Sequence, residues 1–175
     1  MINLLLCGNK KVFDGALTQL ISMTKRTQET INCYILTMDL KPEYVCITDE
    51  QVEFLNEVIK SKNPQNKVTK IDVTNLYEEE FMKCKNESAY CTPYTLLRLL
   101  IDEIPNIPDK ILYLDIDMMI GDDISKLYNI DIDGYEYAAV REKYGRWLIR
   151  PDYINAGMLL LNMKKIKETG LLEKA

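Results

Sequence analysis

The stretch Lys110-Ile111-Leu112-Tyr113-Leu114-Asp115-Ile116-Asp117 joins a short apolar run to two aspartates that are separated by one residue. Such a run is typical of a buried strand in a parallel sheet. Residues two apart on a strand project to the same face, so Asp115 and Asp117 can present two carboxylates to one ion if the strand geometry continues through them. In open parallel sheets, ligands bind beyond the carboxyl ends of the strands. The stretch therefore predicts an α/β fold with a site at this strand end.

Strand-like and helix-like segments alternate before this stretch. The pattern predicts strands over 3–7, 30–37 and 67–73, with helices over 13–25 and after Thr48. Thr48 and Gln51 have the spacing of a capping box, which satisfies free amides at a helix start. This alternation favours a single α/β domain with a mostly parallel central sheet.

The segments on either side of the quoted stretch complete the predicted order of elements. Residues 92–103 have helical periodicity that Pro105 and Pro108 would end, whereas 75–91 are polar and predict a loop or short helix. Beyond the aspartates we expect two short buried strands, 138–140 and 157–161, and a helix over 162–175 that ends with the chain.

The composition excludes several classes of protein. A chain of 175 residues with 47% hydrophobic content can bury one substantial core, and its net charge of −5 argues against a nucleic-acid partner. No apolar run approaches the roughly 20 residues of a membrane helix. The five cysteines form no C-x-x-C pair, which favours reduced thiols. We expect a cytoplasmic protein without an integral membrane segment.

The sequence contains no histidine. The commonest transition-metal ligand and neutral-pH general base is therefore missing from this chain. Any metal must be held by oxygens or by groups outside this sequence, and carboxylates suit Mn²⁺ or Mg²⁺.

An Asp-x-Asp tripeptide does not by itself indicate metal binding. The same tripeptide occurs as Asp131-Ile132-Asp133, where the following Gly134 indicates a turn. Asp115 and Asp117 could likewise be strand-end carboxylates that cap neighbouring amides. An EF-hand loop is excluded, since Ile120 and Lys126 stand where glycine and glutamate are required. A haloacid-dehalogenase-like phosphatase remains an alternative, although Met118 and the late position in the chain argue against it.

Three matches resemble glycosyltransferase family 8, which includes bacterial lipopolysaccharide galactosyl- and glucosyltransferases and glycogenin. Residues Asp109–Asp117 are similar to the family's D-K-V-L-Y-L-D-x-D signature, which contains its DxD motif. Residues Tyr153–Asn162 resemble the family's Y-F-N-A-G-V-L-L-I-N stretch, and Arg98 precedes Asp115 at the spacing of the family's donor-site arginine.

The resemblance implies a Rossmann-like domain of the GT-A type. The implied reaction is metal-dependent, retaining transfer of a hexose from a UDP-sugar to a hydroxyl of a sugar, lipid-linked glycan or protein acceptor, as in lipopolysaccharide biosynthesis. Asp115 and Asp117 would ligate Mn²⁺ or Mg²⁺, and the Ile116 backbone would lie near the ribose.

The remaining predicted donor-site residues come from the same resemblance. Arg98 would contact the diphosphate or donor sugar, unless it is an ordinary ion-paired surface arginine. Asn155 and the amides around Ala156 and Gly157 would bind sugar hydroxyls, although Asn155 is also a common turn residue. Cys7 and Asn9, which end and follow the first predicted strand, complete the predicted set of donor-binding residues.

The sequence departs from the family pattern in several places. Asn9-Lys10-Lys11-Val12 replaces the usual D-x-N-Y, which puts strict uridine selectivity in question. Glu142 takes the approximate place of a family aspartate, where it either orients the sugar or is a solvated charge. The family's H-x-G-x-x-K-P-W-like motif, which supplies a third metal ligand, is missing. We therefore expect residues 1–175 to be one donor-binding domain that is incomplete at its C-terminus.

Two further expectations follow from the incomplete C-terminus. The alternative to an enzyme is a truncated, catalytically inactive module that binds nucleotide or another protein. The second expectation is peripheral attachment to the inner membrane face through C-terminal residues after Ala175.

Overall fold

Six strands form one sheet in the order β3-β2-β1-β4-β6-β5. The computed structural model describes residues 1–40, 42–81 and 92–174. The strands are β1 (Ile2–Cys7), β2 (Ile31–Thr37), β3 (Lys67–Asp72), β4 (Lys110–Leu114), β5 (Tyr137–Arg141) and β6 (Ile154–Asn162). Strands β1 to β4 are parallel to one another, whereas β6 is antiparallel to both β4 and β5.

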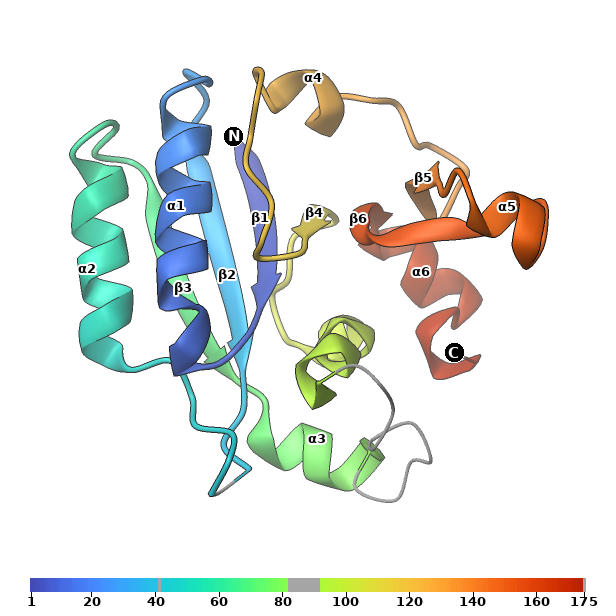
Figure 1. Ribbon diagram of the computed structural model, residues 1–175, viewed down its shortest axis with the longest axis horizontal. Helices are drawn as coiled ribbons and strands as arrows, with labels where there is room; N and C mark the ends of the chain where they lie inside the picture. The colour runs from blue at the N-terminus through green and yellow to red at the C-terminus, as the bar shows by residue number, and fades with distance from the viewer. Residues whose placement is uncertain (41, 82–91, 175) are drawn as a thin grey trace.

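Helices cover both faces of the sheet (Figure 1). The α-helices are α1 (Phe13–Thr24), α2 (Asp49–Lys60), α3 (Thr74–Phe81), α4 (Ser125–Tyr128), α5 (Gly145–Leu148) and α6 (Met163–Thr169). The 3-10 helices are η1 (Lys10–Val12), η2 (Pro93–Glu103) and η3 (Leu172–Lys174). Helices α1 and α2 pack on one face, and η2, α3 and α6 pack on the other.

Alternation along each strand divides the apolar side chains between two cores. On β4, Leu112 and Leu114 face the core beneath α1 and α2, and Tyr113 faces the core beneath η2. Because side chains alternate with a period of two, Asp115 follows Tyr113 to the η2 side. The carboxylate that ends β4 is thereby directed towards the helix that carries Arg98.

The antiparallel direction of β6 decides which segments meet at the site. Leu114, the last residue of β4, pairs with Met158 in the middle of β6, and Lys110, the first, pairs with Asn162 at the end of β6; Leu5 of β1 pairs with Tyr113. The C-terminal ends of β1 and β4 therefore lie at the same sheet edge as the beginning of β6. A parallel β6 would have placed Asn155 at the opposite edge.

Most predicted elements are confirmed. Residues 92–103 are helical as expected, in 3-10 geometry, and Thr48 and Gln51 form the predicted capping box. Part of 75–91 forms α3, and residues 82–91 lie outside the described residues.

Two expectations were wrong. The strand around 138–140 is not buried, because β5 is an edge strand that pairs only with β6 and leaves Val140 exposed. The last predicted helix does not continue to 175, because Gly170 adopts a left-handed conformation with φ of 60° and ends α6 at Thr169.

The expectations of reduced thiols and of no membrane helix can be compared with the structure only over the described residues. Cys7, Cys33 and Cys46 are free thiols, whereas Cys84 and Cys91 fall outside the described ranges. Among residues 1–40, 42–81 and 92–174, each helix is too short or too polar to cross a bilayer.

Candidate functional site

A pocket of about 440 Å³ lies beyond the carboxyl ends of β1 and β4. It contains five of the residues predicted from sequence, which are Cys7, Asn9, Asp115, Ile116 and Asp117. The start of η2 forms another wall through Thr92, Tyr94 and Thr95. Its location agrees with the general rule for open α/β sheets.

Three interactions fix Asp115 in place. The Tyr113 hydroxyl donates to Asp115 Oδ1 at 2.6 Å, and the Asp115 amide donates to the Gly157 carbonyl at 2.7 Å. Gln19 Nε2 on α1 donates to the Asp115 carbonyl at 3.0 Å. The side chain is still 44% exposed, so the carboxylate remains accessible to a ligand in the pocket.

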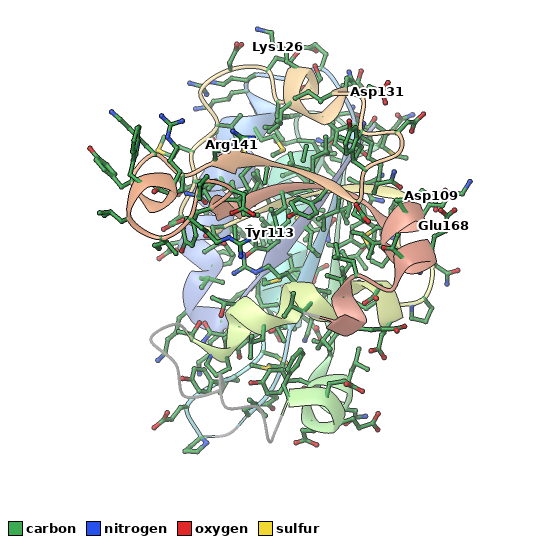
Figure 2. The ribbon with its side chains drawn as sticks, turned by 90° about the vertical axis from the view of Figure 1, so that its right-hand side faces the viewer. Asp109, Tyr113, Lys126, Asp131, Arg141 and Glu168 are labelled. Carbon is green, nitrogen blue, oxygen red and sulfur yellow. The ribbon has the colours of Figure 1, made fainter. Side chains whose placement is uncertain are left out.

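Arg98 connects η2 to the ends of β4 and β6. Its Nη1 donates to the Ala156 carbonyl at 2.6 Å and lies 3.8 Å from Asp115 Oδ1. The guanidinium also stacks on the ring of Tyr113, with Cζ 4.8 Å from the centroid, and Tyr113 is labelled near the centre of Figure 2. Arg98 is therefore an oriented, permanently charged group rather than a free surface arginine.

Asn155, Ala156 and Gly157 border the same carboxylate. Asn155 Oδ1 accepts a hydrogen bond from the Gly157 amide at 2.8 Å, which is the turn role that the sequence also indicates. Its Nδ2 group has no hydrogen-bond partner among the described residues and stays available for a ligand. A Cβ at position 157 would lie 2.5 Å from Asp115 Oδ2, so a larger residue there would displace the carboxylate.

At the end of β1, Asn9 and Cys7 line the pocket with different chemistry. Asn9 Oδ1 accepts from the Lys11 amide at 2.9 Å and so begins η1, which leaves that oxygen engaged. Burial raises the pKa of Cys7 to about 12, with Arg98 opposing the shift. Cys7 is therefore a neutral thiol at neutral pH, and it lines the pocket without acting as a nucleophile.

Glu142 is hydrogen-bonded within a turn. Its Oε2 accepts from the amide of Tyr144 at 2.7 Å and from the amide of Gly145, so it stabilises the turn before α5. The second aspartate pair is also a turn, as expected: the Asp133 amide donates to Asp131 Oδ1 at 2.9 Å, and Gly134 has φ of 84°.

Sequence reasoning missed three residues that position the aspartates. Tyr113 lies two residues before Asp115 on the same strand face, and that spacing was the available signal. Gln19 is a fully buried polar residue on α1, and nothing local indicated its partner. A Cβ on Gly15 would lie 3.0 Å from the Ile116 carbonyl, so this glycine lets α1 approach the loop.

The oxygens at this site fit a hard cation. Asp115 and Asp117 are separated by one residue at the pocket, and Asp117 is exposed. Within the described ranges, however, no cluster of three or more Cys, Asp or Glu side chains could hold a metal by itself. Two carboxylates would require ligand oxygens or water to complete the coordination of Mn²⁺ or Mg²⁺.

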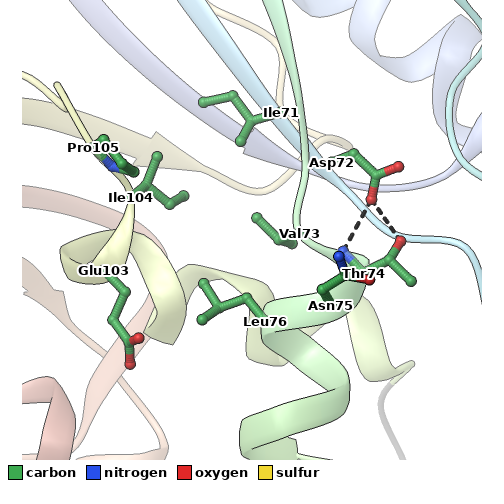
Figure 3. A pocket seen from close by; sticks show the side chains of 9 residues that line it. All are labelled: Ile71, Asp72, Val73, Thr74, Asn75, Leu76, Glu103, Ile104 and Pro105. Atoms are coloured by element: carbon green, nitrogen blue, oxygen red, sulfur yellow. Dashed lines mark hydrogen bonds between the residues drawn. The ribbon is translucent and has the colours of Figure 1, made fainter.

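A second pocket, of about 420 Å³, lies beyond β3 and is shown in Figure 3. Asp72 Oδ1 accepts from the Thr74 amide at 2.9 Å and from the Thr74 hydroxyl at 2.5 Å. Burial alone would raise the pKa of Asp72, but these hydrogen bonds hold it below its usual value. The carboxylate thus serves the start of α3, and the described residues that line this pocket include no lysine or arginine.

Solved structures with the same architecture define the class of fold. The galactosyltransferase LgtC, in complex with donor and acceptor sugar analogs, superimposes with a TM-score of 0.73 at 20% identity, covering 95% of this chain and 60% of LgtC. The glycosyltransferase GlyE of Streptococcus pneumoniae gives a TM-score of 0.72 at 19% identity, covering 99% and 37%. The domain has the GT-A fold of these glycosyltransferases.

Sequence relatives give the family. The profile of Glycosyl transferase family 8 matches residues 3–175. A putative glycosyltransferase of Haemophilus influenzae is 30% identical over 167 residues, covering 89% of this chain and 47% of that protein. GlyF of Streptococcus pneumoniae is 25% identical over 142 residues, covering 81% and 32%. The chain belongs to glycosyltransferase family 8, and it spans about a third to a half of the length of these relatives.

Proposed function

We propose that this chain is the donor-binding part of a retaining, metal-dependent glycosyltransferase. In this proposal, the full protein moves a hexose from a UDP-sugar to an acceptor hydroxyl. Asp115 and Asp117 hold Mn²⁺ or Mg²⁺ together with the donor diphosphate, and Arg98 contacts the diphosphate or the sugar.

One observation carries the proposal: Arg98, Asp115 and Gly157 come from three segments and meet at one sheet edge. The Asp115 amide bonds to Gly157, while Arg98 bonds to Ala156 and lies beside the Asp115 carboxylate. A preorganised arginine next to two carboxylates suits a ligand that carries both anionic oxygens and a bound cation. Family membership and the donor analog in LgtC support the same ligand class.

The chemistry assigned to this chain is binding and charge stabilisation. When bound, a divalent cation offsets the negative charge that grows on the departing diphosphate. The guanidinium of Arg98 adds a fixed positive charge there, and in this proposal Asn155 Nδ2 donates a hydrogen bond to a donor hydroxyl. The departing diphosphate itself can stabilise the oxocarbenium character of the transition state, so no carboxylate of this chain has to act as nucleophile.

A second candidate is a module that binds the nucleotide without turnover. One observation favours it: at the site, the described residues offer two carboxylates and no cluster of three or more side chains that could hold a metal. Incubation with UDP-glucose or UDP-galactose and Mn²⁺ separates the candidates. Release of UDP supports a catalytic chain, whereas binding without release supports the second candidate.

Isothermal titration of UDP, with and without MnCl₂, tests the proposed site. We expect binding that Mn²⁺ strengthens, and loss of the Mn²⁺ effect in Asp117→Ala. The matched control is Asp133→Ala, which changes the equivalent position of the second Asp-Ile-Asp tripeptide. Absence of UDP binding in the unmodified chain, or equal effects of both substitutions, would refute the assignment.

A further inference from the structure

Exposed apolar side chains gather in one segment of the chain. Eight of the twelve large hydrophobic residues that are exposed in the described ranges fall between positions 135 and 153. Four of them lie in or beside α5: Trp147 is 79% exposed, Leu148 83%, Tyr144 67% and Ile149 64%. Apolar patches of this kind on a soluble domain mark surfaces that contact another phase or partner.

The α5 loop, defined here as residues 142–153, holds these side chains outwards by specific contacts. Glu142 accepts from the Tyr144 and Gly145 amides, and the Glu142 amide donates to the Tyr153 carbonyl at 3.0 Å. Gly145 packs so closely on the Tyr153 ring that a Cβ there would overlap it. The loop protrudes from the body of the domain in both Figure 1 and Figure 2.

The charges on the α5 loop and on Arg141, which directly precedes it, are mainly positive, although the net charge of the whole chain is −5. Arg150 pairs with Asp152 through two contacts, and Glu142 is engaged by turn amides. Arg141, Lys143 and Arg146 are exposed and make no salt bridge with a described residue. Two of these cations lie over aromatic rings, Lys143 on Tyr144 and Arg146 on Trp147.

We propose that the α5 loop docks on the surface of an anionic lipid bilayer. Trp147, Leu148 and Ile149 would enter the boundary between headgroups and acyl chains, where Trp is favoured. Arg141, Lys143 and Arg146 would remain among the lipid phosphates and keep their charge in water. Such docking does not depend on the transferase reaction.

Charge complementarity favours a membrane over other occupants. A second copy docked through the same patch would place these three cations against their own equivalents. A carbohydrate would stack on aromatic rings but has no need of Leu148 and Ile149. An anionic bilayer satisfies the aromatic, aliphatic and cationic side chains together.

Trp147 is the single tryptophan of the chain, so its fluorescence reports directly on this loop. The intact chain is titrated with vesicles of phosphatidylcholine and phosphatidylglycerol, and separately with vesicles of phosphatidylcholine alone. We expect a blue shift and protection from iodide quenching with the anionic vesicles only. Raising the salt concentration should reverse binding, because screening weakens the attraction to the surface charge.

Variants separate the two components of docking. Each cation near an anionic surface contributes about fivefold to binding, so Lys143→Gln/Arg146→Gln should bind about 25-fold more weakly. Leu148→Ser/Ile149→Ser should bind at least about tenfold more weakly. The matched control, Lys25→Gln/Lys62→Gln, removes two exposed lysines elsewhere and should change binding by less than about twofold.

Both loop variants alter exposed side chains, and circular dichroism with urea unfolding checks that they fold normally. No blue shift with anionic vesicles would overturn the proposal. It would also be overturned if the control pair weakened binding as much as the loop pair. A blue shift that appears without lipid and grows with protein concentration would also overturn the proposal. It would show that the α5 loop contacts a second copy of the chain and not a membrane.

Discussion

At the scale of single residues, the site depends on the absence of a side chain at Gly157. The Asp115 carboxylate fills the space where a Cβ would stand, and the Gly157 amide and carbonyl bond to Asn155 and Asp115. One glycine therefore permits the contact between β4 and β6 that places the first aspartate.

Gly157→Ala tests this dependence. The new methyl group would meet Asp115 Oδ2 at 2.5 Å and displace the carboxylate. We expect Mn²⁺-dependent UDP affinity to fall at least tenfold, with a loss of about 1–3 kcal/mol in the free energy of unfolding from overpacking. The control is Gly121→Ala, because a Cβ there would meet nothing within 4 Å. Unchanged UDP affinity in Gly157→Ala would contradict the proposed role of Asp115.

Arg98→Lys tests whether the arginine acts through its shape as well as its charge. A lysine cannot hold the Ala156 carbonyl and stack on Tyr113 while offering a second N–H to a phosphate. We expect UDP binding to weaken about tenfold in calorimetry. Arg26→Lys is the comparison, since Arg26 also donates to a carbonyl, that of Ser22, but lies away from the pocket. Equal UDP affinities for Arg98→Lys and Arg26→Lys would show that Arg98 has no specific role in UDP binding.

The residues that sequence could identify are those with a local pattern. Asp115 and Asp117 follow an apolar strand, and that context separated them from the turn at Asp131. The partners of Asp115 could not be found in the same way, because Gln19 and Gly157 reach it only through helix packing and strand pairing. The interaction of Asn155 with Gly157 is local, and the sequence indicates that turn role as one of two possibilities.

At the scale of elements, the sequence predicted those features that depend on residues close together in the chain, such as helix caps. The capping box before α2 is present, with Thr48 Oγ1 accepting from the Gln51 amide at 3.2 Å and Gln51 Oε1 accepting from the Thr48 amide at 3.0 Å. The direction of β6 and the exposure of β5 depend on which strands become neighbours. Those pairings join distant segments, and local periodicity does not specify them.

Thr48→Ala should lower the free energy of unfolding by about 1 kcal/mol, because it removes the acceptor for one free amide at the start of α2. Urea denaturation monitored by circular dichroism measures the change. Thr18→Ala, at an exposed position within α1, is the matched control and should be neutral or slightly stabilising, since alanine has the higher helix propensity. A loss of stability as large at Thr18 would contradict this account of the cap.

At the scale of the whole molecule, two apolar cores enclose one sheet and leave the candidate site at its edge. Residues far apart in sequence, from the end of β1 to the start of β6, converge there (Figure 1). The family was recognisable from sequence because its motifs fall on these edge segments. The GT-A fold is confirmed, while the ligands and the metal remain proposals.

The central claim is that Asp115 and Asp117 hold a divalent cation against a nucleotide diphosphate. Anomalous diffraction from crystals soaked with UDP and MnCl₂ tests it most directly. We predict a manganese peak within coordination distance of both carboxylates and the diphosphate, with Arg98 beside the phosphate oxygens. Manganese bound elsewhere, or UDP bound away from the end of β4, would contradict the claim.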